Sequence, residues 1–505
     1  MNEQRPGTVK RLVIAGGGTA GWMTATAMAI NFNDLLDITL IESEEIGTVG
    51  VGESTVPPLV AFHGLLGLDE QHFMRTCAAT FKLGIGFENW GNIGDRYIHP
   101  FGLIGKPAWI CEFQHFWLRS REQGSDVPLG EYCQEWLAAK EGKFGKSAQP
   151  KLNYAYHFDA ALYAKYLRKI CEARGVKRVE GKIRTVQQHA TTGFIESLTL
   201  DSGKTIEGDL FIDCTGFRGL LIEQTLHTGY EDWSHWLACD SAAAFQTITN
   251  TPPAPYTGAI AHEAGWRWNI PLQHRVGNGV VFCNRYMSDD EAIAKLVKDS
   301  GGTAVRDPWL LRLRPGRRRK AWNKNVISVG LASGFVEPLE STSIHMIMTA
   351  VVRLMHMFPF NGIMQPFADR YNDLARAEIE GIRDFVVLHY HATQRDDSRF
   401  WRYCRGMEIP ESLARRIDLF RKGAYAYFVE GELFRVDSWI SVMLGQGIVP
   451  ETYHRFAQVN DKELFGFLAK HRAETAQAVA KLPSHQEFLR EYCGASTTAW
   501  EVAKK

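Results

Sequence analysis

Three glycines near the start of the chain have a spacing that indicates a chemistry. Gly16, Gly18 and Gly21 follow a short apolar run at 11–15 and precede a helical pattern over 19–31. They fill the GxGxxG positions, which allow a tight turn, close approach of the backbone to a pyrophosphate, and close helix–strand packing. The first amides of the helix would face the phosphates. The predicted dinucleotide contacts here are Gly16, Gly18, Thr19, Ala20 and Gly21.

Later residues indicate which dinucleotide is bound. A second strand over 37–41 ends in Glu42, about 20 residues past the turn, where an acid can bind ribose hydroxyls. A glycine-rich stretch at 47–55 is predicted to be too flexible for a strand and to lie against the ligand. A surface loop is its alternative. We assign Val51, Gly52 and Leu331 as further contacts. Because these contacts run from Gly16 to Leu331, FAD is favoured over a compact nicotinamide site.

Two tryptophans in the middle of the chain form an aromatic ledge. Trp266 and Trp268 alternate along a predicted strand, so both indoles lie on one side. Ile270 continues the alternation and Pro271 stops regular pairing. On its own such a pair most often packs in a core, so its function depends on its neighbours.

Composition excludes several classes of function. The 505 residues are 45% hydrophobic and 23% charged, which is typical of a soluble globular protein. The 57 basic and 57 acidic residues cancel, so we expect no nucleic-acid or membrane partner. The basic run at 317–320 is predicted to be a solvated loop rather than a phosphate site. No apolar run approaches the roughly 20 residues of a membrane span.

Cysteine usage indicates a reducing compartment. Nine cysteines are scattered without a CxxC spacing, which argues against a disulfide framework and against a zinc site. We expect no metal. The first ten residues are polar and show no signal-peptide pattern. A cytoplasmic location is the expectation.

The elements that must position these residues predict an α/β fold. The strand, glycine turn and helix predict a doubly wound, Rossmann-like FAD-binding core with an inserted β-sheet substrate region, over 1–360. Apolar residues at helical spacing over 366–390, and helical patterns beyond, predict a mainly helical layer over 361–505. This layer is expected to cover the substrate pocket.

The chain resembles the flavin-dependent halogenases, and most closely the tryptophan halogenases. The resemblance spans nearly the whole length. Its motifs occur in order at 16–22, 50–55, 81–85, 266–271, 335–342 and 388–401. In this family reduced FAD reacts with oxygen to give a flavin hydroperoxide, which oxidises a halide. The hypohalous acid then travels to an aromatic substrate in a separate pocket.

The resemblance implies roles for particular residues. Lys82 is similar to the lysine that holds or covalently carries the oxidant, and Glu340 matches the catalytic glutamate. Glu337 is a rival within the same motif, with a structural pairing or cap as its other interpretation. The amides of Thr342 and Ser343 fall where the family binds halide. The family usually has glycine in place of Ser343, and bromide is our hypothesis for the preferred halide.

The substrate contacts show both agreement with the family and a departure from it. His99 and Phe101 match positions that sandwich the substrate ring, although a structural role for His99 is the alternative. The tryptophan halogenases hold the amino-acid head group with paired tyrosines and a glutamate, a set that we do not find at 425–440. Phe434 and Trp439 are the predicted contacts in this stretch. An indole or other electron-rich aromatic is therefore favoured over free tryptophan.

The sequence also indicates which partners the protein needs and which other functions its residues allow. No second GxGxxG follows a strand, so FADH2 must come from a nicotinamide on a non-standard surface or from a separate NAD(P)H-dependent flavin reductase. The expected partners are a flavin reductase and a small aromatic substrate. A second copy of the chain is the expected partner in a homodimer. The first alternative function is a flavin-dependent aromatic monooxygenase, which needs no Lys82. The second is a non-catalytic flavin-binding protein.

Overall fold

The computed structural model describes residues 7–45, 52–108 and 110–494, and is built around a six-stranded sheet. Its strand order is β21-β22-β12-β1-β2-β8, parallel except between β21 and β22. The strands are β1 (Arg11–Ala15), β2 (Asp37–Glu42), β8 (Lys177–Glu180), β12 (Leu210–Asp213), β21 (Trp322–Asn323) and β22 (Val326–Ser328). β1 is buried from Leu12 onward because both faces of the sheet are covered. The predicted α/β core is confirmed.

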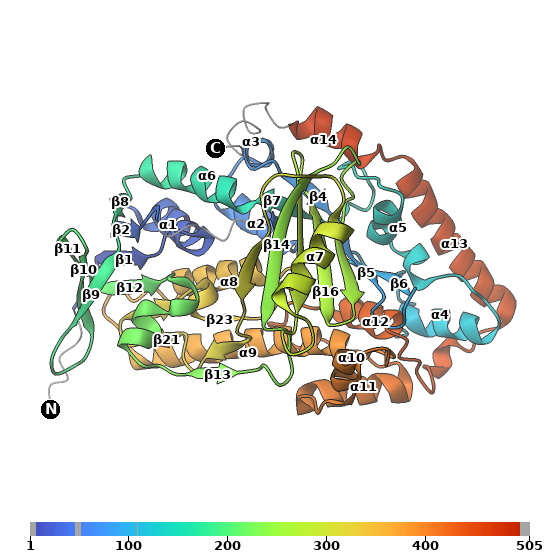
Figure 1. The fold of residues 1–505 in the computed structure, drawn as a ribbon. Helices are drawn as coiled ribbons and strands as arrows, with labels where there is room; N and C mark the ends of the chain where they lie inside the picture. The colour runs from blue at the N-terminus through green and yellow to red at the C-terminus, as the bar shows by residue number, and fades with distance from the viewer. Residues whose placement is uncertain (1–6, 46–51, 109, 495–505) are drawn as a thin grey trace.

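The two faces of this sheet have different covers. Leu12 and Ile14 of β1 face the core shared with helices α1 (Thr19–Phe32), α6 (Ala160–Glu172) and α8 (Ser343–His356). Val13 faces a core shared with an antiparallel sheet on the left of Figure 1. That sheet consists of β9 (Ile183–Gln188), β10 (Ile195–Leu200) and β11 (Thr205–Glu207). Alternate side chains of β1 thus serve two cores.

An inserted eight-stranded sheet stands in the middle of the molecule (Figure 1). Its strands are β5 (Gly84–Glu88), β6 (Arg96–Pro100), β14 (Ser241–Ile248), β15 (Thr257–His262), β16 (Gly265–Pro271), β17 (Val276–Phe282), β18 (Thr303–Ala304) and β19 (Trp309–Arg312). β16 carries the two tryptophans and ends at Pro271, which still aligns with Val276 of β17. The predicted inserted sheet is therefore confirmed.

A small sheet, β3-β7-β4, carries several polar residues of the site. It consists of β3 (Gly52–Ser54), β7 (Ala155–Asp159) and β4 (Thr80–Lys82). The prediction that the whole glycine-rich stretch is too flexible for a strand is wrong for Gly52–Ser54, because β7 offers it an antiparallel partner. Tertiary pairing overrides weak strand propensity here. Val51, predicted to contact the cofactor, lies outside the described residues.

The C-terminal region is helical, as expected. Its helices are α9 (Gln365–His391), α10 (Arg399–Gly406), α11 (Glu411–Gly423), α12 (Val436–Gly445), α13 (Asp461–Ala480) and α14 (His485–Cys493). α13 runs along the outer right edge in Figure 1, and α14 returns to the top near α3 (Glu70–Thr76). There the Phe81 N–H of β4 donates to Nε2 of His485, over 3.2 Å. The boundary between residues 360 and 361 stays a prediction.

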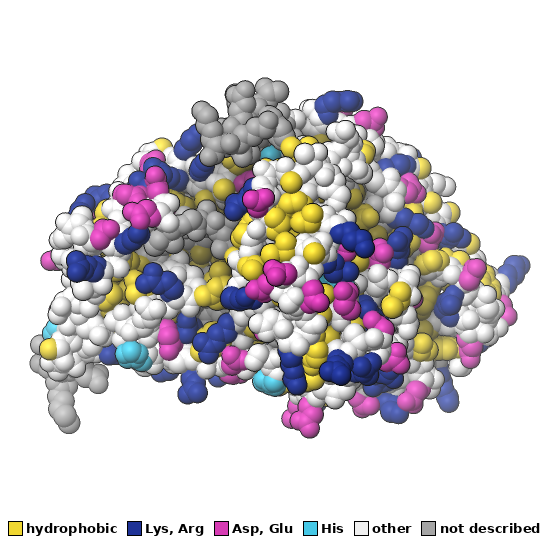
Figure 2. All heavy atoms as spheres, viewed as in Figure 1, with side chains coloured by type: hydrophobic (Ala, Val, Ile, Leu, Met, Phe, Trp, Pro, Cys, Tyr) yellow, Lys and Arg dark blue, Asp and Glu magenta, His cyan; other side chains and the backbone are white. Residues whose placement is uncertain are grey.

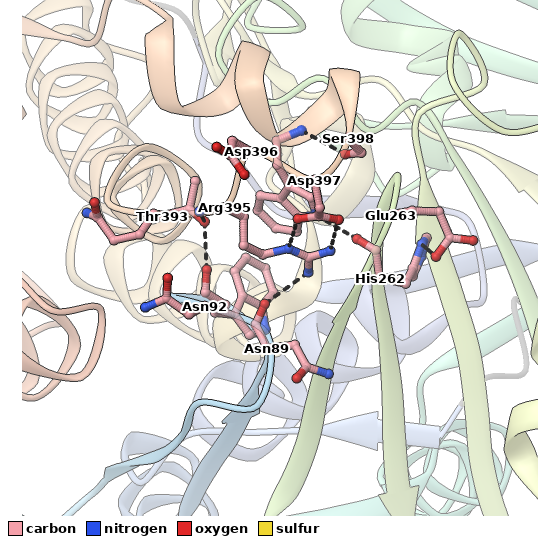
Figure 3. A network of polar contacts seen from close by, with 12 residues as sticks. Asn89, Asn92, His262, Glu263, Thr393, Arg395, Asp396, Asp397 and Ser398 are labelled. Atoms are coloured by element: carbon pink, nitrogen blue, oxygen red, sulfur yellow. Dashed lines mark hydrogen bonds and ion pairs between the residues drawn. The ribbon is translucent and has the colours of Figure 1, made fainter.

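A polar network fixes the end of α9 to the inserted sheet (Figure 3). The Arg395 guanidinium donates twice to Asp397, over 2.8 Å each, and once to the Asn89 carbonyl, over 2.9 Å. It also lies 4.7 Å from the Trp401 ring. Thr393 donates to the Trp90 carbonyl over 2.7 Å. These bonds hold the segment that follows α9 against the loop that follows β5.

The surface charges are mixed in sign, and one basic run differs from its prediction. Lysine, arginine and acidic side chains are interspersed around a central hydrophobic strip in Figure 2. The prediction of a solvated basic loop is wrong for Arg317 and Arg318. Arg318 is buried in β20 (Gly316–Arg318) beside Glu223, and Arg317 pairs with Glu231, because enclosed cations require carboxylate partners. No helix in the described part of the chain is long and apolar enough to cross a membrane.

Candidate active site

A large cavity opens where β1 and β2 end and α1 begins. Its volume is about 1090 Å³, which suits a large ligand. Six of the predicted cofactor residues line it: Gly16, Gly18, Thr19, Ala20, Glu42 and Leu331. Gly21 lies beneath, where an added Cβ would be 1.8 Å from the Gly16 carbonyl oxygen. Gly52 lies at the start of β3, and its neighbour Glu53 lines the cavity.

The glycine turn fits a dinucleotide. Gly16 has φ +112°, a region that favours glycine, and a Cβ there would lie 2.3 Å from the Cys214 carbonyl oxygen. Because the glycines of this turn have no side chains, the N-terminal amides of α1 lie close to the cavity. Glu42 is fixed at the rim, because it accepts hydrogen bonds from Trp22 Nε1 over 3.2 Å and from Arg178 Nε over 2.5 Å. These residues would hold an FAD molecule.

The aromatic ledge forms one wall of this cavity. Trp266, Trp268 and Ile270 line it, and the two indole rings lie 6.2 Å apart. Pro271 is buried at the strand end and does not line the cavity. Trp268 lies over Gly279, where a Cβ would be 1.9 Å from the ring. The ledge is therefore an apolar boundary of the cavity, and Trp266 Nε1 donates to the buried Glu337.

Lys82 lies just outside the cavity, next to Ser341, which lines it. Its side chain is fully buried at the end of β4. Nζ donates to the Thr55 carbonyl over 2.9 Å and to Ser341 Oγ over 2.8 Å. It also lies 5.0 Å from the Phe101 ring. Burial lowers the pKa of Lys82 to about 7, although the charge of Glu340 opposes the shift. Because Ser341 lines the cavity, Lys82 is one hydroxyl group away from it.

Glu340 lies between two histidines. His99 Nδ1 is 2.9 Å from one carboxylate oxygen, and His389 Nε2 is 2.9 Å from the other. Burial would raise the pKa of Glu340, but the charge and hydrogen bonds of His99 and His389 outweigh burial and lower it to about 2. His389 is itself oriented, because its Nδ1–H donates to the Phe385 carbonyl over 2.8 Å. Glu340 is therefore a fixed carboxylate at neutral pH.

Glu337 occupies different surroundings, although it is only three residues away. Its Oε2 accepts from Trp266 Nε1 over 2.9 Å and from the Tyr390 hydroxyl over 2.7 Å. Its Oε1 is buried and has no hydrogen-bond partner among the residues that the structure describes. Burial raises the pKa of Glu337 to about 7, and the two hydrogen bonds oppose the shift. This geometry suits the structural interpretation of Glu337, because its carboxyl group joins β16 to α9.

The predicted substrate residues divide into two groups. His99, Phe434 and Trp439 surround the ring of Phe385, at 5.5, 3.8 and 4.8 Å between ring centroids. Phe101 lies instead beside Lys82. Sequence reasoning assigned no role to Phe385 and His389, which come together one helical turn apart on α9. Their i, i+4 spacing was the available signal.

The predicted halide residues lie at the start of α8. Thr342 is the N-cap and Ser343 the first residue, so their amides lie at the positive end of the helix, where intrahelical acceptors are lacking. Ser343 lines the cavity, and the Thr342 hydroxyl is buried with no partner in the described part of the chain. The preceding Ser341 has φ +60°, which is uncommon outside glycine.

Comparison with known proteins gives a family for this arrangement. A family model described as Tryptophan halogenase matches residues 11–462. The chain is 35% identical to the 7-chloro-L-tryptophan 6-halogenase KtzR of Kutzneria sp., with 96% of this chain and 99% of the relative covered. It is 33% identical to the tryptophan 7-halogenase RebH of Lentzea aerocolonigenes, with 97% and 99% covered.

Solved structures agree with this result. Xcc4156, a flavin-dependent halogenase from Xanthomonas campestris, has a TM-score of 0.95 and 52% identity, with 97% of this chain and 99% of that one covered. BrvH, a flavin-dependent halogenase from Brevundimonas sp. BAL3, has a TM-score of 0.92 and 42% identity, with 96% and 99% covered. The resemblance inferred from six ordered motifs is confirmed. The chain belongs to the tryptophan halogenase family and is a flavin-dependent halogenase.

Proposed function

We propose that this halogenase brominates an electron-rich aromatic such as indole, with Lys82 and Glu340 as its catalytic residues. The observation that carries the proposal is the position of Ser341. Its hydroxyl lines the large cavity and accepts from Lys82 Nζ, while the adjacent Glu340 faces His99. Oxidant made in the cavity would reach Lys82 and Glu340, which lie just outside it.

The cavity residues would bind and orient the cofactor. The glycine turn and α1 would hold the phosphates of FAD, and Glu42 the ribose. When bound in its reduced form, FAD with oxygen and halide supplies the hypohalous acid. We infer that a separate NAD(P)H-dependent reductase provides FADH2. The amides of Thr342 and Ser343 would bind the halide, and bromide is the proposed ion.

Lys82 would hold the oxidant beside the substrate. In its charged form, the bonds to Thr55 and Ser341 use two of the three ammonium N–H groups. The third can donate to the hypohalous acid. In its neutral form the amine is a nucleophile for the halogen. A pKa of about 7 makes both forms available near neutral pH, and the Phe101 ring restricts water at this position.

Glu340 would accept the proton that the ring loses when it regains aromaticity. Its low pKa keeps it ionised; His99 is hydrogen-bonded to one carboxylate oxygen, and His389 Nε2 lies 2.9 Å from the other. His99, Phe434 and Trp439 with Phe385 form an aromatic group that we name the Phe385 cluster. This cluster supports an aromatic substrate without an amino-acid head group. Arg416, a cation next to this cluster, stacks 4.4 Å from Trp439 and is paired with Glu432, so it is already engaged.

The test combines the enzyme with FAD, a flavin reductase, NADH, oxygen and bromide, and compares indole with L-tryptophan by mass spectrometry. Brominated indole is the expected main product. Preferred turnover of tryptophan would overturn the substrate assignment, and a dominant chloro product from equal bromide and chloride would overturn the halide assignment. A hydroxylated product without halide would favour the monooxygenase alternative. Lys82→Ala should lose halogenation while flavin reoxidation is unchanged.

A further inference from the structure

A buried row of hydroxyl groups connects Lys82 to His157, a residue of the central strand β7 on the same face of the small sheet. Lys82 Nζ donates to Ser341 Oγ over 2.8 Å, and Ser341 donates to Ser54 Oγ over 3.0 Å. Ser54 Oγ is 2.6 Å from Thr257 Oγ1, which is 2.9 Å from His157 Nε2. All five side chains are at least nine-tenths buried. We name this set the hydroxyl relay.

The far end of the relay fixes the direction of every hydrogen bond. The Thr80 hydroxyl lies 2.6 Å from the Pro271 carbonyl oxygen, which can only accept, so Thr80 donates to it. His157 Nδ1, 3.0 Å from the same hydroxyl, must then donate to Thr80. The neutral ring consequently has its lone pair on Nε2, and Thr257 donates to it. Thr257 therefore accepts from Ser54.

The relay is thus polarised in one direction, from Lys82 towards His157. Each hydroxyl accepts from the group on the Lys82 side and donates to the group on the His157 side. Hydroxyl groups that only stabilise a core by hydrogen bonding to one another need no common donor direction and no titratable group at either end. The relay has a common direction and a titratable group at each end. Chains of this kind polarise their members cooperatively, which favours proton transfer along them.

Burial lowers the proton affinity of both ends of the relay. Burial lowers the pKa of Lys82 to about 7. Burial also lowers the pKa of His157 well below its ordinary value, and the charges of Lys82 and His485 lower it further. Loss of the Lys82 charge removes one of these causes. The charged and titratable groups near the relay are Lys82 on β4, Glu340 before Ser341, Glu53 on β3, His485 on α14, and Asp159 on β7 with its partners Arg275 and His274.

We propose that His157 takes a proton from Lys82 through the hydroxyl relay and so converts the lysine to its nucleophilic amine. One N–H bond of the ammonium breaks, each hydroxyl passes its proton to the next, and an N–H bond forms at His157 Nε2. The products are a neutral amine and an imidazolium, with no change of oxidation state. Rotation about the Cε–Nζ bond turns the lone pair to the oxidant. The same path in reverse restores the starting state.

This inference rests on the proposed role of Lys82. His157 contacts neither the cavity nor the Phe385 cluster, so it is a positioning residue for the Lys82 proton. Ser341 has a left-handed backbone, at φ +60°, which costs conformational free energy. The relay explains this conformation, because it places the hydroxyl between Lys82 and Ser54.

The test uses Thr257→Val, which keeps the shape of the side chain and removes the relay hydroxyl. Thr257→Ser is the matched control, because it retains the hydroxyl and loses a methyl group. Single-turnover bromination is measured from pH 6 to 9 with pre-reduced FAD. We expect Thr257→Val and His157→Gln to be slower by about tenfold or more near pH 7, with the acid limb moved to higher pH. Thr257→Ser should stay within about threefold of the unmodified enzyme.

Several outcomes would overturn the relay. An unchanged pH profile in Thr257→Val would do so, and equal losses in Thr257→Val and Thr257→Ser would indicate packing instead. A slow Thr257→Val with a normal His157→Gln would exclude His157 as the acceptor. FAD affinity and melting temperature, measured on each variant, identify misfolding. Full halogenation by Lys82→Ala would instead refute the proposed function, so the two failures are distinguishable.

Discussion

Glu337 and Glu340 lie three residues apart in one motif, are both fully buried, and have opposite acid–base properties. The pocket of Glu337 contains an indole N–H and a phenol, which donate hydrogen bonds without bringing charge. The pocket of Glu340 contains two imidazoles: His99 Nδ1 is hydrogen-bonded to one carboxylate oxygen, and His389 Nε2 lies 2.9 Å from the other. The pKa of Glu337 is raised to about 7 by burial, whereas the histidines overcome burial and lower that of Glu340 to about 2.

The difference shows that burial alone does not determine the state of a carboxyl group. Desolvation raises the pKa of both residues, and the neighbours decide the outcome. One pocket holds a structural acid that joins β16 to α9 through Trp266 and Tyr390. The other holds an ionised base beside the aromatic cluster. Four predictions test this division, beginning with the largest effect.

Glu340→Gln should cause the largest loss. The amide keeps the shape of the side chain but cannot accept the ring proton, so we expect bromination to fall by about 10² to 10⁴-fold. Product formation by mass spectrometry measures the loss, and flavin reoxidation should continue at its normal rate. A variant that retains full bromination would mean that another group takes the proton.

Glu337 should make stability fall as pH rises. Its folded pKa of about 7 lies above its ordinary value, so the folded state binds more protons between pH 4.5 and 7. This corresponds to a loss of roughly 3 kcal/mol across that window. Denaturant unfolding at pH 5 and pH 8 should show the loss in the unmodified enzyme and a smaller one in Glu337→Gln. Glu340 has the opposite sign, because its stabilisation is lost as pH falls from 4.5 towards 2. Identical pH dependence in the two proteins would contradict the assignment of Glu337.

His389→Gln should have an intermediate effect. The amide can donate to Glu340 without carrying a charge, so the pKa of Glu340 should rise above about 2 and the acid limb of the bromination rate should move to higher pH. The loss should be smaller at pH 8, where the carboxylate is ionised in either protein. A pH–rate profile distinguishes this effect from a uniform loss, which would indicate displacement of α9.

Glu337→Gln should affect bromination least. The amide oxygen can accept from Trp266 and Tyr390, so the rate should stay within about threefold of the unmodified enzyme. Glu337→Ala is the contrasting variant, because it leaves two buried donors unpaired and should lower stability by about 1–3 kcal/mol. If Glu337→Gln lost as much bromination as Glu340→Gln, the comparison between the two residues would fail.

Sequence-based predictions were most accurate for features that depend on residues close together in the chain. The glycine turn, the alternation of Trp266 and Trp268, and the helical spacing of α9 depend on neighbouring residues, and the structure contains each of them. The roles of Lys82 and Glu340 came from resemblance. Their surroundings could not be predicted, because His389 approaches Glu340 from another element and Thr257 reaches Ser54 from 203 residues away. The errors at Gly52–Ser54 and Arg317 have the same origin, since tertiary partners override local preference.

The bond between the Phe81 amide and His485 has a consequence for how the enzyme is made. It joins residues 404 positions apart, and α14 packs near the strand that carries Lys82. At about 5–20 residues per second, the ribosome needs on the order of 20–80 s to reach His485 after Phe81. The nascent chain can bury its glycine turn long before then. Phe81, the neighbour of Lys82 on β4, gains this contact only after α14 has been made.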